Sequence, residues 1–486
     1  MKKFVALVLA LVMVLGLCAC GGDGDSDKAP GTTPDTPPVA DNQASGKEDS
    51  TPDAAPSADP GDITSWILED DPASITGTVR WWMPFKGSQG MDALIAEFNE
   101  TYPNITVELT TYNNNSDGNM AVNTAIMAGE VDVLASFNLM HAYARWENGL
   151  YMDLTDRCEE EGIDLVANWG SDVYKYDGAI YTFPCGGLSN YVAINMTAWN
   201  EAGLGDLPTE WTWDEYLDAC RKMTKRNADG TVAVYGGSDH HTVNNFTYSL
   251  GQVQGSNVYY NNETGESTFD SDEIIHALQR EYDAEIVEKI WFPKSVYRAD
   301  NLQSQQTFVP GTAASILTPN LVRFLADREN YPTDYITGFA PWPVEEKGQT
   351  NYMSGVMPFS HAGICVGCKD EEAAWAFLKW YSTYGVKYLV AAGHQPNWRG
   401  SDTSAALTLL YGSEEAAAEI VDVESFKRVV GVSSNPSYYE DNLTAYSEIN
   451  SILTEYVMYA LNDTMTPEDA MKEAAALANE AIRNAG

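Results

Sequence analysis

The stretch at residues 177–224 constrains the fold more than any other part of the chain, because strands, turns and a helix must follow one another there in close succession. Two short strands are predicted between residues 174 and 183, joined by a tight turn at Asp177-Gly178. Residues 184–187 show no apolar alternation, so we expect a bare loop there. A succession of this kind is typical of an α/β protein.

The second half of this stretch combines an apolar strand with a capped helix. Residues 191–194 are predicted to be a strand that ends at Asn195, followed by a connection at 200–208 that contains Gly and Pro. A helix is predicted to begin at Thr212, whose hydroxyl can cap it while Glu215 reaches back. The residues of its buried face recur at helical spacing and are Tyr216, Ala219, Cys220 and Met223.

In fixed order, the stretch contains the motifs DGAIYTFP at 177–184, AIN at 193–195, AG at 202–203 and PTEWTWDE at 208–215. This linked series resembles the extracellular solute-binding proteins (family 1) of bacterial ABC importers, and in particular their sugar-binding group. Ile194 departs from the pattern, because the family usually has an aromatic residue before this Asn.

The part of the chain before this stretch predicts a parallel sheet with helices on its faces. The expected elements are a strand at 78–83, a helix at 91–102, a strand at 105–109, a helix near 120–128 and a strand at 131–134. This opening also resembles the family, and further family motifs occur at 98–107, 129–133, 149–155, 308–314, 336–343, 371–381 and 393–396. The resemblance therefore covers the chain from about Thr78 to its end.

The resemblance implies a two-lobe periplasmic-binding-protein-like fold of type II. Each lobe is expected to be a mainly parallel α/β sheet flanked by helices, with hinge strands that let the lobes close on a ligand. The N-lobe is expected at 75–156 and 356–395, and the C-lobe at 157–355 and 396–486, with the chain crossing between them near Asp156, Gly355 and Gln395. Because ligands of open parallel sheets lie beyond the carboxyl ends of the strands, the loops there are expected to line the site.

The beginning of the chain predicts export and a lipid anchor. Lys2 and Lys3 precede an apolar run that is too short to span a bilayer, which is typical of a signal peptide at residues 1–19. The sequence Leu-Cys-Ala-Cys-Gly that follows resembles a bacterial lipobox. It implies that Cys20 is diacylated and holds the protein on the extracellular face of the cell membrane, with an ordinary cleaved signal as the alternative. Residues 20–74 are rich in Asp, Pro, Ser and Thr, and we expect a disordered stalk.

The charge of the chain excludes some partners. The formal net charge is −42, from 70 acidic and 28 basic residues, so the surface repels nucleic acids and anionic lipids. After the leader, no apolar run is long enough to span a bilayer. We therefore expect a monomer that contacts the membrane through its N-terminal lipid only.

The cysteines do not indicate a metal site. Cys365 and Cys368 have the spacing of metal ligands, but they lie in an apolar strand pattern without a second pair. Burial as small hydrophobic residues is the preferred interpretation. We expect no metal, no cofactor and no framework of disulfides.

The candidate ligand-binding residues follow from the chemistry of a sugar, which offers apolar CH faces and many hydroxyl groups. Aromatic rings and planar polar side chains grip such a ligand. For each aromatic residue core packing is an equal alternative, and histidines at such positions are more often structural than ligand-binding. The candidates in the expected loops are Trp82, Phe85, Asn138, Phe183, Tyr191, Asp239, His240, Asn320, Trp342, Met353, Trp398, Tyr438 and Tyr439, with Tyr112, Ser136, Phe137 and His241 as further residues of the same loops. Asn320 lies where the family often has a Trp.

The leading interpretation is a receptor without catalytic residues that captures a carbohydrate, expected to be an oligosaccharide, and delivers it to the permease of an ABC importer. An exported glycan-active hydrolase with two carboxylates is an alternative that 70 acidic residues neither support nor exclude. No nucleophile elbow, HExxH motif or phosphate loop occurs. Receptors for another solute, such as a peptide or polyamine, and a sensor subunit that signals ligand occupancy remain further alternatives.

Overall fold

The computed structural model of the 486-residue chain describes residues 63–137, 139–170, 175–239, 243–247, 250, 259–261, 264–319, 321–351, 356–402, 404–430 and 445–485. Several sequence predictions fall outside these residues. They concern the leader, the lipidation site and part of the candidate site, namely Cys20, Asn138, His240, His241, Asn320, Met353, Tyr438 and Tyr439.

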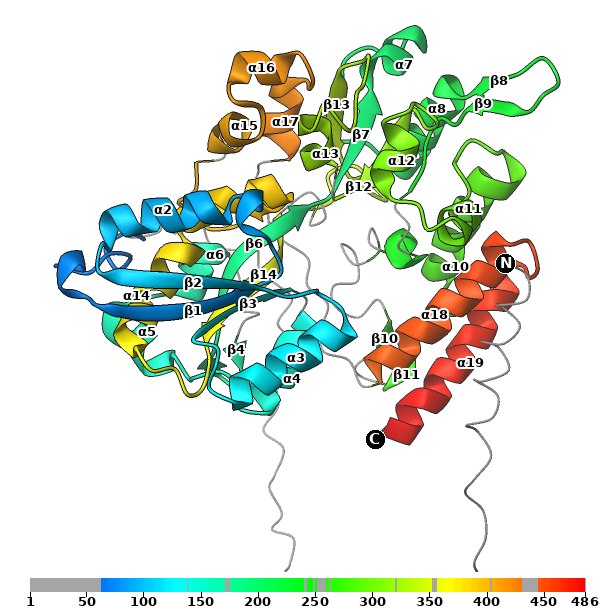
Figure 1. Cartoon of the computed structure of the whole chain (residues 1–486). Coiled ribbons are helices and arrows are strands. Elements are labelled where there is room, and N and C mark those ends of the chain that lie inside the picture. The colour runs from blue at the N-terminus through cyan, green and yellow to red at the C-terminus, as the bar shows by residue number, and fades with distance from the viewer. Residues whose placement is uncertain are drawn as a thin grey trace, which may run out of the picture. The chain divides into compact units, whose positions relative to one another are not determined.

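A six-stranded sheet with the strand order β15-β6-β14-β3-β1-β2 forms the centre of what we call the first lobe (Figure 1). The first three strands of the chain are parallel, because β1 pairs with β2 on one side and with β3 on the other. The remaining strands run antiparallel to their neighbours. The expectation of a mainly parallel sheet is therefore wrong for this lobe, which has a mixed sheet. Its strands are β1 (Gly77–Met83), β2 (Ile105–Thr111), β3 (Val133–Phe137), β6 (Phe183–Ser189), β14 (Val356–Ile364) and β15 (Gln395–Pro396).

The sides of this sheet differ because side chains alternate along each strand. On β1, Val79, Trp81 and Met83 are buried while the residues between them are partly exposed. The ring of Trp81 packs against Phe377 and Tyr381 of one of the helices of this lobe. The helical elements of the lobe are η1 (Pro72–Ser74), η2 (Gly87–Gln89), α2 (Met91–Thr101), α3 (Ser116–Met127), α4 (Leu139–Glu147), α5 (Thr155–Glu161), α6 (Leu165–Trp169), α14 (Glu371–Ser382) and η7 (Tyr384–Ala392).

A small hairpin, β4 (Lys175–Tyr176) and β5 (Ala179–Ile180), confirms the predicted Asp-Gly turn. Asp177 and Gly178 both have positive φ, of 50° and 84°, which matches the twist of a tight hairpin. The predicted loop at 184–187 is wrong, because these residues belong to β6. Gly186 lies where a side chain does not fit, because a Cβ there would lie 2.8 Å from Leu389 Cδ1 and 3.0 Å from Ser360 Oγ.

A three-stranded antiparallel sheet forms the centre of the second lobe. Its middle strand is β7 (Tyr191–Asn195), which confirms the predicted strand, and it lies between β12 (Ser315–Thr318) and β13 (Thr337–Pro341). The chain thus passes from the first sheet to the second at Asn190. A mainly parallel sheet was expected here as well, and the antiparallel pairing corrects it. The sequence also failed to predict α7 (Met196–Glu201), which Asn195 caps.

Helix α8 (Trp213–Met223) confirms the predicted cap and buried face. Thr212 Oγ1 accepts from Glu215 N at 3.3 Å, and Glu215 Oε2 accepts from Thr212 N at 3.0 Å. All four residues of the predicted stripe are buried, because the cap fixes where the helix begins and therefore which face it turns inward.

Two long helices lie side by side at the end of the chain (Figure 1), and their apolar faces pack with α10 (Asp272–Tyr282) into one core. Thr466 caps the last of them through a hydrogen bond from Asp469 N at 3.1 Å. The remaining elements of the second lobe are β8 (Lys225–Arg226), β9 (Val232–Val234), η3 (Val243–Thr247), β10 (Tyr260–Asn261), β11 (Glu266–Ser267), α10 (Asp272–Tyr282), the π-helical η5 (Asp283–Val287), α11 (Lys294–Ala299), α12 (Ser304–Phe308), α13 (Val322–Ala326), α15 (Ser404–Tyr411), α16 (Glu414–Ala418), α17 (Val423–Val429), α18 (Tyr446–Leu461) and α19 (Pro467–Ala485).

The first described residues pack against the first lobe. Trp66 and Ile67 are buried, and the Trp66 ring contacts Trp169 and Phe183. Glu69 follows, and its backbone N donates to Tyr102 Oη at 3.2 Å while its carboxylate accepts from Lys379 Nζ at 2.7 Å.

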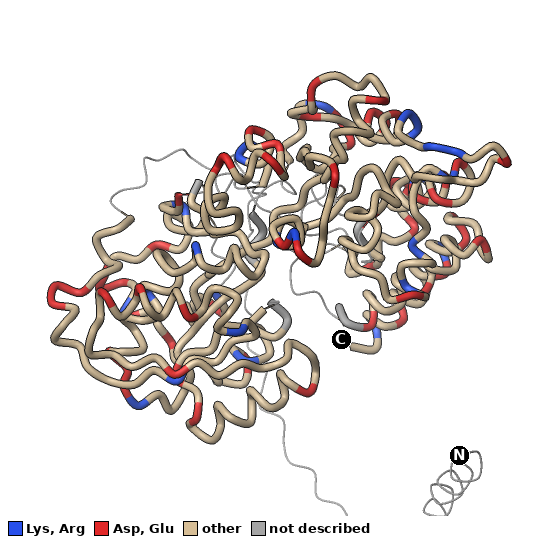
Figure 2. Tube along the Cα trace, turned by 45° about the horizontal axis from the view of Figure 1, so that its top comes forward, with Lys and Arg blue, Asp and Glu red and all other residues tan. Residues whose placement is uncertain are grey.

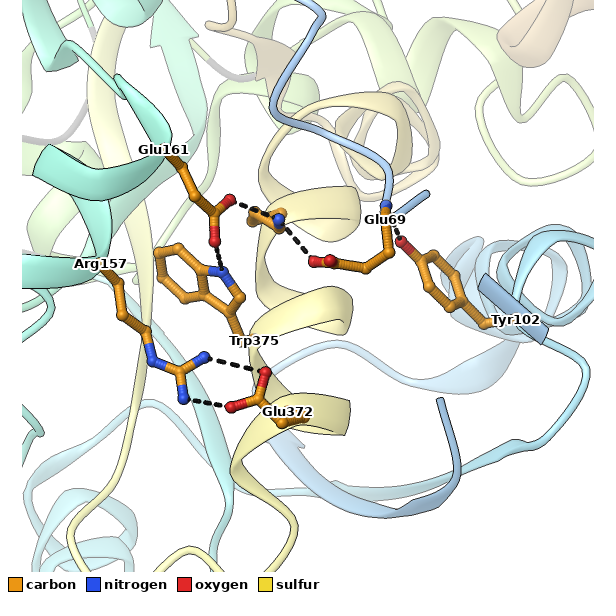
Figure 3. Close-up of polar contacts among 7 residues, drawn as sticks. Glu69, Tyr102, Arg157, Glu161, Glu372 and Trp375 are labelled. Atoms are coloured by element: carbon orange, nitrogen blue, oxygen red, sulfur yellow. Dashed lines mark hydrogen bonds and ion pairs between the residues drawn. The ribbon is translucent and has the colours of Figure 1, made fainter. Parts of the chain in front are cut away.

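Lys379, on α14, also donates to Glu161 Oε2 at 2.6 Å, and Glu161 accepts from Trp375 Nε1 (Figure 3). Arg157 pairs with Glu372 beside it. Residues 63–69 are therefore fixed to α14 as a strap. These residues lie inside the region expected to be a disordered stalk, and the limits of the stalk and of the lobes stay predictions.

Candidate functional site

Four rings gather at the edge of the first sheet where β1 and β3 end, and we call them the ring cluster: Phe85, Phe137, Phe359 and His394. The His394 ring lies 4.9 Å from the rings of Phe85 and Phe137 and 5.5 Å from that of Phe359, between centroids. Phe85 and Phe137 are 4.9 Å apart. Because β1 and β3 are parallel, their carboxyl ends meet at one edge, which brings the residues after them together.

His394 is a neutral member of this cluster. Burial, together with the charge of Arg323, lowers the pKa of His394 to about 3. Its Nδ1 lies 3.4 Å from Ser360 Oγ, and Ser360 in turn holds Gly186 of β6 by two hydrogen bonds of 2.9 and 3.0 Å. The imidazole is therefore oriented by the sheet and adds a polar edge to an otherwise apolar group of rings.

Two amide side chains that follow His394 in the sequence have polar atoms without a partner among the described residues. Gln395 and Asn397 are only 2% and 3% exposed. Gln395 Oε1 and both polar side-chain atoms of Asn397 form no hydrogen bond with any described residue. Buried polar atoms are nearly always paired with protein or water, because leaving them unpaired costs free energy. Such atoms therefore indicate a place where a ligand or water supplies the missing partners.

Arg323, on α13 of the second lobe, reaches the same region. Its Nη1 donates to Ala392 O at 3.2 Å, two residues before His394, and its guanidinium lies over the Phe324 ring at 4.6 Å. Its Nε is buried and has no partner within the described part of the chain. Tyr191 holds the start of α13, because its hydroxyl accepts from Leu321 N at 2.9 Å and from Val322 N at 3.3 Å.

The described candidates from the sequence lie in different surroundings. Phe85 belongs to the ring cluster, as does Phe137, and Trp82 lies partly buried on β1 close to it in the sequence. Trp398 is buried and donates from Nε1 to Asn168 Oδ1 at 3.1 Å. The structure does not bring the remaining candidates to the ring cluster: Phe183 packs in the first core with Trp66, Trp169 and Trp375, Trp342 packs in the second-lobe core, and Asp239 pairs with Lys294.

Sequence reasoning did not select Arg323, Phe359, His394, Gln395 or Asn397. A signal existed for two of them, because His394 and Gln395 lie inside the family motif at 393–396. For Arg323 and Asn397 no local pattern exists, because what marks them is the absence of a partner, which is a property of the tertiary structure.

Two hollows lie elsewhere in the second lobe. One is an open groove between α11 and α18, lined by residues such as Arg298, Thr454 and Tyr459. The other is a small cavity beside Asp239 and Glu281. Neither is lined by the ring cluster, and the carboxylates of the second are already paired with Lys294.

Residues 85–388, which are more than half of the chain, match the family model of the bacterial extracellular solute-binding proteins. The chain belongs to this family. Three residues of the ring cluster of this solute-binding protein lie within the matched range, and His394 lies just after it. A search of curated proteins found no match.

Solved structures show the same two-lobe fold and confirm the expected fold class. A sugar transporter from Rhizobium etli, in an open conformation, has a TM-score of 0.69 and 16% identity, over 84% of this chain and 99% of that chain. The Listeria monocytogenes ABC substrate-binding protein in complex with cycloalternan has a TM-score of 0.62 and 19% identity, over 84% and 99%. The cyclic alpha-maltosyl-1,6-maltose binding protein from Arthrobacter globiformis has a TM-score of 0.60 and 18% identity, over 84% and 100%.

Three further findings concern the described residues of this solute-binding protein. Cys158, Cys185, Cys220, Cys365 and Cys368 are unpaired. No group of His, Cys, Asp and Glu side chains in the described ranges is arranged to hold a metal ion. Of the helices that the structure describes, none combines the length and apolarity needed to cross a membrane.

Proposed function

We propose that this solute-binding protein captures a carbohydrate, an oligosaccharide, and delivers it unchanged to the permease of an ABC importer. The observation that supports this most directly is the combination of the ring cluster with unpartnered buried amides at the carboxyl ends of β1 and β3. Rings cover the apolar faces of a sugar, and amides exchange hydrogen bonds with its hydroxyl groups. Neighbours of the same fold bind cycloalternan and cyclic alpha-maltosyl-1,6-maltose, which favours the same ligand class here.

The proposal includes a clamp and an anchor. Arg323 belongs to the second lobe and contacts the first through Ala392 O, so a ligand beside it would touch both lobes and favour their closure. We propose that Cys20 carries two acyl chains and holds the protein, as a monomer, on the extracellular face of the cell membrane. No catalytic step is part of this function.

A thermal-shift screen against mono- and oligosaccharides tests the ligand class. A ligand present at a hundred times its dissociation constant adds about 2.7 kcal/mol to the free energy of unfolding, which raises the melting temperature. A broad panel that leaves the melting temperature unchanged would contradict the carbohydrate assignment. Turnover of the glycan during the assay would instead support a hydrolase, and a shift with peptides or polyamines a receptor for another solute.

The variant Asn397→Ala tests the site. We expect weaker binding of the saccharide without a loss of stability, because the replaced side chain forms no hydrogen bond with the described residues. Asn168→Ala is the matched control, since Asn168 is equally buried but accepts from Trp398 Nε1. It should lower the melting temperature. If Asn397→Ala leaves affinity unchanged, the ligand does not contact this amide.

The variant Cys20→Ala tests the anchor. We expect the protein to leave the membrane fraction and appear in the medium, because a protein without acyl chains has no other hydrophobic anchor in this proposal. Persistence in the membrane fraction would contradict it.

A further inference from the structure

The charge of Arg323 has no counter-ion among the described residues. Its polar contacts are one hydrogen bond to a backbone carbonyl and a ring contact with Phe324. No carboxylate of the described residues forms an ion pair with it, and the side chains that act on its charge are the phenols of Tyr191 and Tyr331. The neighbouring His394 is neutral.

Three other cations of this chain, in contrast, form ion pairs with carboxylates. Lys294 and Lys379, 1% and 2% exposed at the side chain, each contact two carboxylates. Arg280, 9% exposed, forms a two-bond pair with Glu345. Acidic residues are spread over both lobes (Figure 2), so a carboxylate beside Arg323 would be easy to supply. The absence of one among the described residues is therefore informative.

Arg145 shows that a guanidinium can also be buried with neutral partners only. Its Nε, Nη1 and Nη2 donate to Asn123, Ser136 and Asn119 at 2.7–2.8 Å, so all three nitrogens are satisfied. Arg323 differs, because Nε is unpaired and Nη2 forms no hydrogen bond with a described residue. Arg145 is a structural arginine, whereas Arg323 has unused donors.

The unused donors of Arg323 have a specific geometry. The Ala392 carbonyl occupies Nη1, which leaves the N–H of Nε and one N–H of Nη2 on the same side of the planar group. These two N–H bonds are parallel and match the two oxygens of a carboxylate, a sulfate or a phosphate. Neighbouring hydroxyl groups of a neutral sugar could also accept both hydrogen bonds, but they would leave the charge without a counter-ion.

We propose that the ligand is an acidic carbohydrate, whose anionic group accepts both hydrogen bonds from Arg323 Nε and Nη2. This inference rests on the proposed function and names its substrate class. The anionic group is the carboxylate of a uronic acid or the oxygens of a sulfate or phosphate ester, which share this chemistry. At physiological ionic strength the repulsion between an acidic ligand and a chain of charge −42 is screened beyond about 8 Å, so the local cation dominates at contact.

Isothermal titration with matched saccharides tests this inference. One arm uses di- and trisaccharides of galacturonic, glucuronic, mannuronic and guluronic acid, and the same compounds after chemical reduction of each carboxyl group to a hydroxymethyl group. A second arm uses sulfated and phosphorylated hexoses beside their parent sugars. We expect the anionic member of a pair to bind about ten- to a hundredfold more tightly than its neutral partner, which is the range for a charge-assisted contact.

Variants then assign the preference to Arg323. Arg323→Gln should abolish the preference for the anionic member, and Arg323→Lys should retain part of it, because a lysine keeps the charge without the planar pair of donors. Arg221→Gln is the matched control, since Arg221 is an exposed arginine of the same lobe that pairs with Glu288. It should leave every affinity unchanged.

The outcomes separate the inference from the proposed function. Binding of the neutral members as tightly as the anionic ones, or an unchanged preference in Arg323→Gln, would overturn the acidic ligand and leave carbohydrate capture intact. Binding of no saccharide in either arm would overturn the proposed function itself. A preference confined to the sulfated and phosphorylated arm would support the anionic site and identify the ester as its ligand.

Discussion

Lys294 and Arg323 are both cations of the second lobe, but Lys294 is buried among acids, whereas Arg323 is partly buried beside neutral groups. Lys294 contacts Asp239 and Glu281 through Nζ, at 3.0 and 2.5 Å, and its backbone N donates to Glu285 at 3.0 Å. We call these three acids the carboxylate cluster. It carries more negative than positive groups, whereas the surroundings of Arg323 carry one cation and no described acid.

The difference shows how each site can become neutral. Burial raises the pKa of Glu281 and raises that of Glu285 well above its usual range, so the carboxylate cluster can remove its excess charge by holding a proton. Burial alone would lower the pKa of Lys294, but the three acids raise it, and the ammonium stays charged. A guanidinium cannot release its proton in a protein. The cluster therefore balances itself, while Arg323 depends on an anion from outside the chain.

The largest expected effect is that of Lys294→Met, which leaves the carboxylate cluster without its cation. We expect the free energy of unfolding to fall by about 3–5 kcal/mol, the usual cost of an uncompensated buried charge. Urea unfolding measures it. Lys472→Met is the control, because Lys472 forms an exposed pair with Glu468, and it should cause no measurable change. A loss as small as that of the control would show that Lys294 is not needed to balance the cluster.

Glu285→Gln sharpens the comparison through pH. The pKa of Glu285 is raised in the folded protein, so its contribution to stability is fully present below the unfolded value of 4.5 and is lost as pH rises through the folded value. Gln keeps an acceptor for Lys294 N and cannot ionise. The variant should therefore gain stability relative to the wild type as pH rises from 4 to 8. A difference that does not change with pH would show that the pKa of Glu285 is the same in the folded and unfolded states.

Arg323→Met should affect the stability of the free protein little, in contrast to Lys294→Met. The replacement removes a cation without a counter-ion and loses one hydrogen bond to Ala392 O, and these effects oppose each other. We expect a change within about 1 kcal/mol in urea unfolding without ligand. A loss of the size expected for Lys294→Met would break the comparison, because it would mean that Arg323 has a structural anionic partner.

The smallest effect is expected in the combination of Arg323→Met with Lys294→Met. The two cations share no contact residue in the described structure. Their effects on the free energy of unfolding should therefore add within about 0.5 kcal/mol. A larger coupling energy would show that the two sites are linked through the second lobe.

The features that the sequence predicted correctly are those that neighbouring residues determine. The cap at Thr212 joins residues three apart, and the Asp177-Gly178 turn joins adjacent strands, so each is encoded locally. Strand β6 was not predicted, because its extended structure depends on pairing with strands that are distant in the sequence. Gly186 and Gly187 are typical of a loop in the sequence, but in the structure β14 pairs with β6 on one side and β15 on the other.

The candidate site was predicted in part for the same reason. Phe85 and Phe137 follow predicted strands, so they could be placed at one edge of the sheet. Phe183 and Trp342 are also aromatic residues in expected loops, but the structure buries them in the hydrophobic cores. Arg323 could not be selected, because the sequence does not show whether an acidic side chain lies near an arginine in space.

The strap of Trp66 and Glu69 has a mechanical consequence. It is fixed to the first lobe through Lys379 and the Trp169 and Phe183 rings, and these contacts include no residue of the second lobe. Any pull on the chain before Ile63 is therefore delivered to α14 and its sheet. The second lobe, which carries Arg323, bears none of that load directly and remains able to move relative to the first lobe.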